Sequence, residues 1–349
     1  MGDLGAEQYG QKLMTRSTVT SAKTRKSARS APAANATFDV LVLATMSAGK
    51  TSFINALIGQ ELLHTANEAT TACVTRVEHR QGTRRFSGAC YCYNDTELAY
   101  ERSPSVALLR DWNADAEVKR ISLAGTFKVL PRPAPGLVLH DTPGPNNSQD
   151  ESHARLTLEA IRNVSFKALC YVLNASQLGT RDDRLLLEQL REELVTKPAQ
   201  PIYFILNKVD LLDPEKGESV EGYVHMAQRY LRDIGFEQPI IIPTMASAAL
   251  YARKALSADT LTRAQRSQLR QALDVLDSNK RALLNATVAP DLIKRRVGKA
   301  LDSLERKQQA NQSDTRASDK NKLRQLVTIS GLKTIEVLIN HQRRLDEQP

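Results

Sequence analysis

Short apolar runs rich in branched residues alternate with amphipathic segments between residues 37 and 255. The apolar runs cover residues 38–43, 137–140, 168–173, 202–206 and 239–243. Between them, apolar residues recur at helical spacing over 50–58, 152–164, 181–194 and 219–233. Near-continuous apolar strands that alternate with helices indicate a mostly parallel sheet covered on both faces. The predicted fold class is therefore α/β, doubly wound, with ligands at the carboxyl ends of the strands.

The strand pattern stops near residue 255, and residues 256–349 are predicted to form a helical, strongly charged region. Apolar residues recur there at three- and four-residue spacing, in the groups Leu269, Leu273 and Leu276; Leu323, Leu326 and Val327; and Leu332, Ile335, Leu338 and Ile339. This spacing predicts two or three amphipathic helices that need a surface to cover. We expect a polar loop over 311–321 and a final helix over about 323–345 that packs on the preceding domain.

Residues 1–36 contain few large apolar side chains and are predicted to be a flexible basic tail. No apolar run has the length of a membrane span or a signal peptide, so we expect a cytoplasmic protein. The four cysteines fit buried, reduced thiols.

The net charge of +9 is concentrated at the two ends. Residues 1–36 carry six basic and two acidic side chains, residues 37–250 carry 22 and 26, and residues 251–349 carry 20 and 11. Basic ends suit the phosphates of an anionic membrane surface, which would make the protein peripheral to a membrane. A solvated face with no ligand is an equally good interpretation, and nucleic acid is not an expected partner.

Residues 44–51 have the pattern of a phosphate-binding loop between a strand and a helix, with Ala44 in place of the first glycine. The backbone N–H groups around Ala48 and Gly49 and the helix dipole would cradle a phosphate. Lys50 would reach the β- and γ-phosphates, and the Thr51 hydroxyl would bind Mg²⁺.

Residues 207–210, Asn-Lys-Val-Asp, follow a buried strand and favour guanine over adenine. The Asp210 carboxylate can accept hydrogen bonds from the N1 and N2 donors of guanine, a donor pair that adenine lacks. Asn207 would brace the loop, and the stem of Lys208 would lie along the purine. Ser247 and Ala248 follow the last strand, where a backbone N–H would face the guanine O6.

Residues 141–144, Asp-Thr-Pro-Gly, supply a further candidate site at the end of another strand. Asp141 would hold Mg²⁺, and the Gly144 N–H would sense the γ-phosphate. Thr70 and Thr71 are candidates for a switch threonine, and we favour Thr71 as both a Mg²⁺ ligand and a catalytic residue. The whole predicted nucleotide site comprises Ala44, Ser47, Ala48, Gly49, Lys50, Thr51, Ser52, Gly144, Asn207, Lys208, Asp210, Ser247 and Ala248, with Thr51, Thr71 and Asp141 as metal ligands.

With these motifs in this order, residues 38–255 resemble the GTPase domain of bacterial dynamin-like proteins, members of the dynamin family of large GTPases. The resemblance rests on residues 45–59, the following Glu61-Leu-Leu, the Thr71-Ala pair and residues 141–146. Gly49 and Asp141 are 92 positions apart, which leaves room for an enlarged sheet between them. The resemblance implies GTP/GDP and Mg²⁺ as ligands, a GTPase domain over 37–255 and a neck-like helical region over 256–349.

Catalysis in this family is organised by the phosphate loop, often when two GTPase domains meet. By resemblance, the catalytic residues are Ser47, Lys50 and Thr71, and Ser47 helps to bind the phosphates and a monovalent cation. Met46 replaces the water-positioning glutamine of eukaryotic dynamins, which leaves that role unassigned and implies slow intrinsic turnover. Arg84 and Arg85 could supply transition-state charge, but nothing in the sequence favours them over surface arginines.

The leading hypothesis is therefore a GTP hydrolase that dimerises through its GTPase domain. The alternative is a GTP-gated binding module with negligible hydrolysis that acts on a protein partner. About 95 residues follow the predicted GTPase domain, too few for a dynamin stalk. Three hypotheses explain this short region. The chain is a fragment, or a separate stalk-bearing dynamin-like protein supplies the stalk, or the protein does not remodel membranes.

Overall fold

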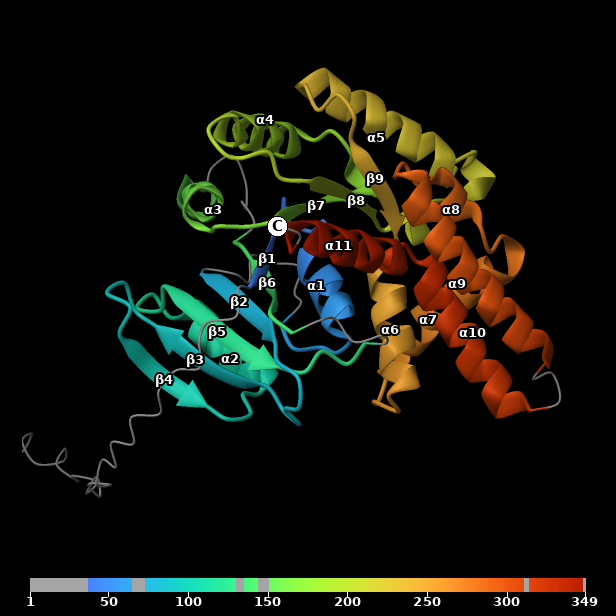
Figure 1. The fold of residues 1–349 in the computed structure, drawn as a ribbon, viewed down its shortest axis with the longest axis horizontal. Helices are drawn as coiled ribbons and strands as arrows, with labels where there is room; N and C mark the ends of the chain where they lie inside the picture. Colours follow the sequence, from blue (N-terminus) through green and yellow to red (C-terminus); the bar gives the residue numbers. More distant parts are fainter. Residues whose placement is uncertain (1–36, 65–72, 130–134, 144–150, 311–313, 348–349) are drawn as a thin grey trace, which may run out of the picture. The chain divides into compact units, whose positions relative to one another are not determined.

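A nine-stranded sheet forms the centre of the protein in the computed structural model, which describes residues 37–64, 73–129, 135–143, 151–310 and 314–347 (Figure 1). The strands follow the order β4-β3-β5-β2-β6-β1-β7-β8-β9. Their bounds are β1 (Phe38–Ala44), β2 (Val74–His79), β3 (Ser87–Tyr91), β4 (Glu97–Glu101), β5 (Arg120–Gly125), β6 (Leu137–Asp141), β7 (Ala168–Asn174), β8 (Ile202–Asn207) and β9 (Ile240–Thr244).

The strands from β6 through β1, β7 and β8 to β9 pair in parallel, as the apolar runs predict. β2 joins the edge of this group antiparallel to β6, and β5 then pairs in parallel with β2. β3 and β4 complete the sheet with antiparallel pairs. The strands β2 to β5 thus occupy the segment between Gly49 and Asp141 for which the sequence predicts an enlarged sheet.

Helices cover both faces of the sheet and continue beyond it. They are α1 (Lys50–Ile58), α2 (Val106–Ala114), α3 (Glu151–Asn163), α4 (Arg181–Val195), α5 (Val220–Ile234), α6 (Ala246–Leu256), α7 (Arg263–Ser278), α8 (Ala282–Ala286), α9 (Asp291–Ala310), α10 (Thr315–Ile329) and α11 (Leu332–Asp346). The described residues also contain three short 3₁₀ turns, η1 (Ala175–Gln177), η2 (Val209–Leu211) and η3 (Pro214–Lys216).

The buried core consists of two clusters because successive side chains of a strand point to opposite faces of the sheet. Val40 and Val42 of β1 pack with residues of α1 and α11, whereas Leu41 and Leu43 pack with residues of α3, α4 and α5. Both faces are therefore apolar and covered, which confirms the predicted doubly wound α/β fold followed by a helical region.

In the part of the chain that the structure describes, five helices, α7 to α11, follow residue 262, more than the two or three that the sequence predicts. The prediction of a polar loop over 311–321 is wrong beyond residue 313, because α10 begins at Thr315. The Asp314 side chain accepts a hydrogen bond from Ala317 N at 3.0 Å and thereby caps the start of α10. Among the helices of the described residues, none combines the length and the hydropathy that crossing a bilayer requires.

The single final helix predicted over 323–345 is also wrong, because the chain turns sharply between α10 and α11. Gly331 has φ 85°, in the left-handed region, and its N-terminal neighbour Ser330 accepts a hydrogen bond from Met245 N at 2.9 Å. A Cβ atom at Gly331 would lie 2.3 Å from the carbonyl oxygen of Pro243. The break therefore lets α11 pack closely against β9 and α1, where Leu332, Ile335, Leu338 and Ile339 are buried.

We predict that Gly331→Ala lowers the free energy of unfolding by about 2 kcal/mol or more, because it combines a left-handed backbone with a close contact. Gly298→Ala is the matched control, since a Cβ there meets no heavy atom within 4 Å and the site lies inside α9. The control should stabilise the protein by about 0.5–1 kcal/mol. Urea denaturation of both variants measures the two effects. Equal stability of the two variants would contradict this account of the turn.

Candidate functional site

The phosphate loop connects the end of β1 to the start of α1. Ser47 and Gly49 both have positive φ values, 59° and 90°, so the loop folds back before Lys50 begins the helix. Ala44 is the last residue of β1 and is fully buried, with no positive φ value. Its methyl group is therefore compatible with the backbone at the position where the usual pattern has glycine.

The first turn of α1 supplies polar groups at the end of this loop. Lys50, Thr51 and Ser52 are its first three residues, so their N–H groups have no acceptor one turn earlier in the helix. Ser47 is exposed beside them, and Ala48 is buried. A helix start with free N–H groups and a positive dipole end suits an anion such as a phosphate.

Lys50 and Asp141 meet at the carboxyl ends of the paired strands β1 and β6. The Lys50 ammonium donates a hydrogen bond to the Asp141 carboxylate, and both side chains are buried. Behind them, the Thr142 hydroxyl donates to the carbonyl oxygen of Val42 at 2.8 Å, which fixes the end of β6 against β1. The structure thus brings together the residues predicted to bind phosphate and Mg²⁺.

Asn207, the last residue of β8, bonds to two neighbouring loops. Its side-chain Nδ2 donates to the carbonyl oxygen of Ala48 at 2.9 Å, and its Oδ1 accepts from Ala246 N at 3.1 Å. A Cβ atom at Gly49 would lie 2.4 Å from the same Nδ2. Asn207 therefore packs directly under the phosphate loop and joins it to the start of α6.

Lys208 and Asp210 follow Asn207 at the same edge of the sheet. Lys208 has φ 64°, and its Cε atom lies 3.9 Å from the position of a Cβ on Gly49, so its stem passes the phosphate loop. Asp210 is exposed to solvent, yet enough protein surrounds its carboxylate to raise its pKa above the usual value. Desolvation likewise lowers the pKa of Lys208.

Ser247 and Ala248 lie in the first turn of α6, next to the Ala246 N–H that Asn207 holds. Ala248 is buried and Ser247 is half-buried. The first turn of α6 thus lies beside the end of β8, so the predicted base-binding residues gather at one edge. Thr70, Thr71 and Gly144, the remaining predicted site residues, lie outside the described residues.

Two side chains that support this site have no recognisable motif in the sequence. Asn55, buried in α1, accepts hydrogen bonds from Leu62 N at 3.0 Å and Leu63 N at 2.9 Å, which ties the following segment to the helix. A single asparagine inside the apolar segment 53–58 is the signal that could have identified it. Arg253 of α6 donates to the carbonyl oxygen of Ala56 in α1 and to Glu336 in α11, contacts that no local pattern predicts.

Comparisons with known proteins agree with this geometry. Residues 40–209 match the model of the dynamin family. A bacterial dynamin-like protein of Nostoc punctiforme (strain ATCC 29133 / PCC 73102) is 26% identical over 197 residues, which are 53% of this chain and 27% of that protein. This part of the chain, just under half of its length, is thus similar to the dynamin family. The match begins in β1 and ends in η2, so it includes the phosphate loop, Asp141 and Asn207.

Two solved structures are also similar to this chain. Both are described as an oligomerised bacterial dynamin pair that provides a mechanism for sensing and tethering membranes at long range. Each is 17% identical and covers 80% of this chain and 43% of the other, with TM-scores of 0.48 and 0.45. The chain therefore spans less than half the length of these relatives. Asp210, Ser247 and Ala248 lie beyond the residues that the dynamin-family model matches.

We predict that Asn207→Ala weakens GDP binding roughly tenfold or more, because it removes two buried hydrogen bonds that hold the phosphate loop against α6. Asn174→Ala is the matched control. Asn174 pairs with Asn207 in the β7–β8 register, but its side chain bonds to Ser176 and Gln177, the partners it has among the described residues. Titration with a fluorescent GDP analogue measures both affinities. Equal affinities of the two variants would show that the brace has no role in nucleotide binding.

Proposed function

We propose that this chain is a dynamin-like GTPase that binds GTP with Mg²⁺ and hydrolyses it to GDP and phosphate. The observation that carries the proposal is the convergence of Lys50, Asp141 and Asn207 on one phosphate loop within a dynamin-family domain. We take residues 37–255 as the GTPase domain and residues 256–349 as a neck-like helical region. The proposed nucleotide-binding and catalytic residues are those that the sequence predicts.

Guanine specificity is proposed to come from Asp210. Its carboxylate lies at the edge of the sheet that also carries the phosphate loop, and solvent reaches it. One carboxylate can accept from both the N1–H and the exocyclic N2–H of guanine, whereas adenine presents an acceptor at N1. The first turn of α6, with Ser247 and Ala248, offers N–H groups of the kind that a guanine O6 accepts.

The oxygen donors at the end of β6 fit Mg²⁺, a hard cation that prefers carboxylate and hydroxyl ligands. The Asp141 carboxylate is paired with the ammonium of Lys50, and we propose that Lys50 turns to the phosphates when nucleotide binds, which leaves this carboxylate to the ion. We propose Thr51, Thr71 and Asp141 as the residues that hold it. When bound, the ion would neutralise charge on the β- and γ-phosphates.

Hydrolysis requires a water oxygen to bond to the γ-phosphorus while the bond to the bridging β–γ oxygen breaks, which yields GDP and phosphate. Lys50 and the N–H groups of the first α1 turn would stabilise the charge that moves onto these oxygens. Ser47 would bind the phosphates and a monovalent cation from the tip of the loop. Met46 is 40% exposed beside it and offers only a weakly accepting thioether, so it cannot orient the water well.

The poor suitability of Met46 for orienting water supports dimerisation as part of the catalytic cycle. Met46 and Ser47 are both exposed at the tip of the phosphate loop, where a second copy can reach them. A partner GTPase domain would order the loops around the γ-phosphate and complete the site. If no partner improved the rate, the chain would act instead as a GTP-gated module that binds a protein partner.

Membrane association is proposed from charge. The basic excess at the two ends would attract anionic lipid headgroups, and a dimer would present two such sets of charges to one surface. We therefore propose a cytoplasmic protein that associates peripherally with membranes. A separate stalk-bearing dynamin-like protein is a further proposed partner.

We predict that Asp210→Asn exchanges guanine preference for xanthine preference. The asparagine Oδ1 can still accept from N1–H, but its Nδ2 donates, which suits the C2 carbonyl of xanthine and opposes the N2 donor of guanine. Loss of a charged contact typically costs about 1.5–3 kcal/mol, so GDP affinity should fall roughly tenfold or more. Competition between GDP, xanthosine diphosphate and ADP measures the exchange. Unchanged GDP preference in the variant would contradict the role given to Asp210.

We also predict that the GTPase rate per molecule rises with protein concentration, because Met46 of the phosphate loop orients the water poorly and a second copy would complete the site. GDP with aluminium fluoride, a transition-state mimic, should shift the mass from monomer to dimer in light scattering. Lys50→Ala is the control that should neither hydrolyse GTP nor respond to the mimic. A constant rate per molecule with an unchanged mass would remove the dimerisation hypothesis and favour the gated binding module.

A further inference from the structure

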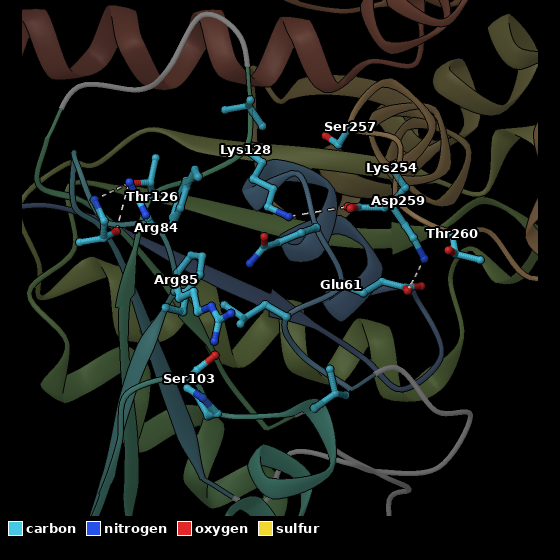
Figure 2. Close-up of a pocket in the computed structure, with 18 residues that line it drawn as sticks. Glu61, Arg84, Arg85, Ser103, Thr126, Lys128, Lys254, Ser257, Asp259 and Thr260 are labelled. Atoms are coloured by element: carbon cyan, nitrogen blue, oxygen red, sulfur yellow. Dashed lines mark hydrogen bonds and ion pairs between the residues drawn. The ribbon is translucent and has the colours of Figure 1, made fainter.

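A second cleft lies at the far end of α1 from the phosphate loop. Its volume is about 770 Å³, within the range of roughly 300–1,000 Å³ typical of small-molecule sites. Figure 2 shows Arg84, Arg85 and Ser103 on one side of it, with Lys254 and Asp259 on the other. These groups come from the β2–β3 turn, from the segment before α2, and from the end of α6 and the segment that follows it.

The pairing of the strands shows that this cleft is separate from the nucleotide site. β2 runs antiparallel to β6, with Thr75 beside Asp141 and Glu78 beside Val138. β2 therefore begins near the phosphate loop and runs toward the amino ends of the parallel strands. The β2–β3 turn, which carries Arg84 and Arg85, lies at that side of the sheet. α1 likewise begins at the phosphate loop and spans roughly 13 Å before the residues that line the cleft.

Arg84 and Arg85 stand on a turn that is anchored on both sides. On one side, Thr83 N donates to the Thr126 hydroxyl at 3.2 Å. On the other side, the buried ring of Phe86 stacks on Phe127, with ring centroids 6.3 Å apart. The backbone that carries the two guanidinium groups is therefore held against the end of β5.

The charges of the opposite wall are balanced within the protein. Lys254 is buried and donates to Glu61 and Gln265, and Lys128 pairs with Asp259 at 3.7 Å. Within the described ranges, no ion pair joins Arg84 or Arg85 to an acidic side chain, although both arginines line the cleft. The excess positive charge of the cleft is therefore that of the two arginines.

We propose that this cleft is a second anion site, which binds a phosphate-bearing ligand through Arg84 and Arg85. A guanidinium group presents a planar fork of N–H donors that matches phosphate oxygens, and two adjacent forks match a di- or triphosphate or a phosphorylated headgroup. The hydroxyl groups of Ser103, Thr126 and Thr260 line the same space and offer further donors. Arg84 and Arg85 lie away from the proposed nucleotide site of their own chain, and binding an anion in this cleft would give them a function there.

The test is calorimetric titration of the full chain with inorganic tripolyphosphate in the Lys50→Ala background, which disables the phosphate loop. Tripolyphosphate should bind this protein, and Arg84→Ala/Arg85→Ala should reduce the affinity roughly tenfold or more. Arg229→Ala/Arg232→Ala is the matched control, because it removes two exposed arginines from α5, away from the cleft. Both pairs are exposed, so thermal unfolding should show equal stability of the two variants.

Sedimentation with vesicles of phosphatidic acid and phosphatidylcholine distinguishes the sources of the phosphate. If Arg84→Ala/Arg85→Ala loses tripolyphosphate but keeps vesicle binding, the site takes a soluble ligand. If it loses both, the site takes a lipid headgroup. Absence of tripolyphosphate binding in the Lys50→Ala background, or equal binding by both double variants, would overturn the proposal. Since the phosphate loop is disabled throughout, these outcomes do not depend on whether the chain hydrolyses GTP.

Discussion

The side-chain amide of Asn207 connects the parts of the molecule on which the proposed chemistry depends. Parallel pairing brings the carboxyl ends of β1, β6 and β8 to one edge of the sheet, but it does not by itself fix the loops that follow them. Asn207 bonds to the loop after β1 and to the start of α6 after β9. Both bonds are buried and both partners are backbone groups, so loss of the Asn207 side chain leaves two polar groups unsatisfied, which is costly in a protein interior. The phosphate loop and the predicted base-binding segment are thereby held in one arrangement.

The helix α6 extends this arrangement into the helical region. At its start, Met245 N donates to Ser330 at the turn between α10 and α11. Near its end, Arg253 bonds to the Ala56 carbonyl of α1 and to Glu336 of α11, and Lys333 donates to the same Glu336 carboxylate at 3.2 Å. The helix that begins with Lys50 and the final helix of the chain are therefore joined through one arginine. This connection gives the neck-like region a direct contact with the helix that would bind phosphate.

The sequence predicts the parallel strands and the phosphate loop because both depend on local patterns. A strand buried on both faces is continuously apolar, as β1 and β7 are, and a phosphate loop is a contiguous motif between a strand and a helix. The added strands are harder to recognise, since β2 alternates between buried and half-buried residues and β4 is almost entirely exposed. Their number and order depend on pairing between segments that are distant in sequence.

Tertiary contacts explain the other differences. The turn at Gly331 is required by the approach of α11 to Pro243 O, which no pattern around residue 331 records. Arg253 carries no motif, because its function depends on three helices that meet only in the folded protein. The sequence likewise raised Arg84 and Arg85 as candidates for transition-state charge, and the strand register instead places their turn at the opposite edge of the sheet. The contacts of these residues therefore depend on the folded protein and cannot be predicted from the sequence around them.

The convergence of Lys50, Asp141 and Asn207 on one phosphate loop is the basis of our proposal that this chain is a GTP hydrolase. Single-turnover phosphate release from GTP, with Mg²⁺ and excess protein, tests that claim most directly. We expect release from GTP but not from ATP, and loss of release when Mg²⁺ is chelated or when Lys50 is replaced by alanine. Phosphate release that is equal for ATP and GTP, or that persists in Lys50→Ala, would contradict it.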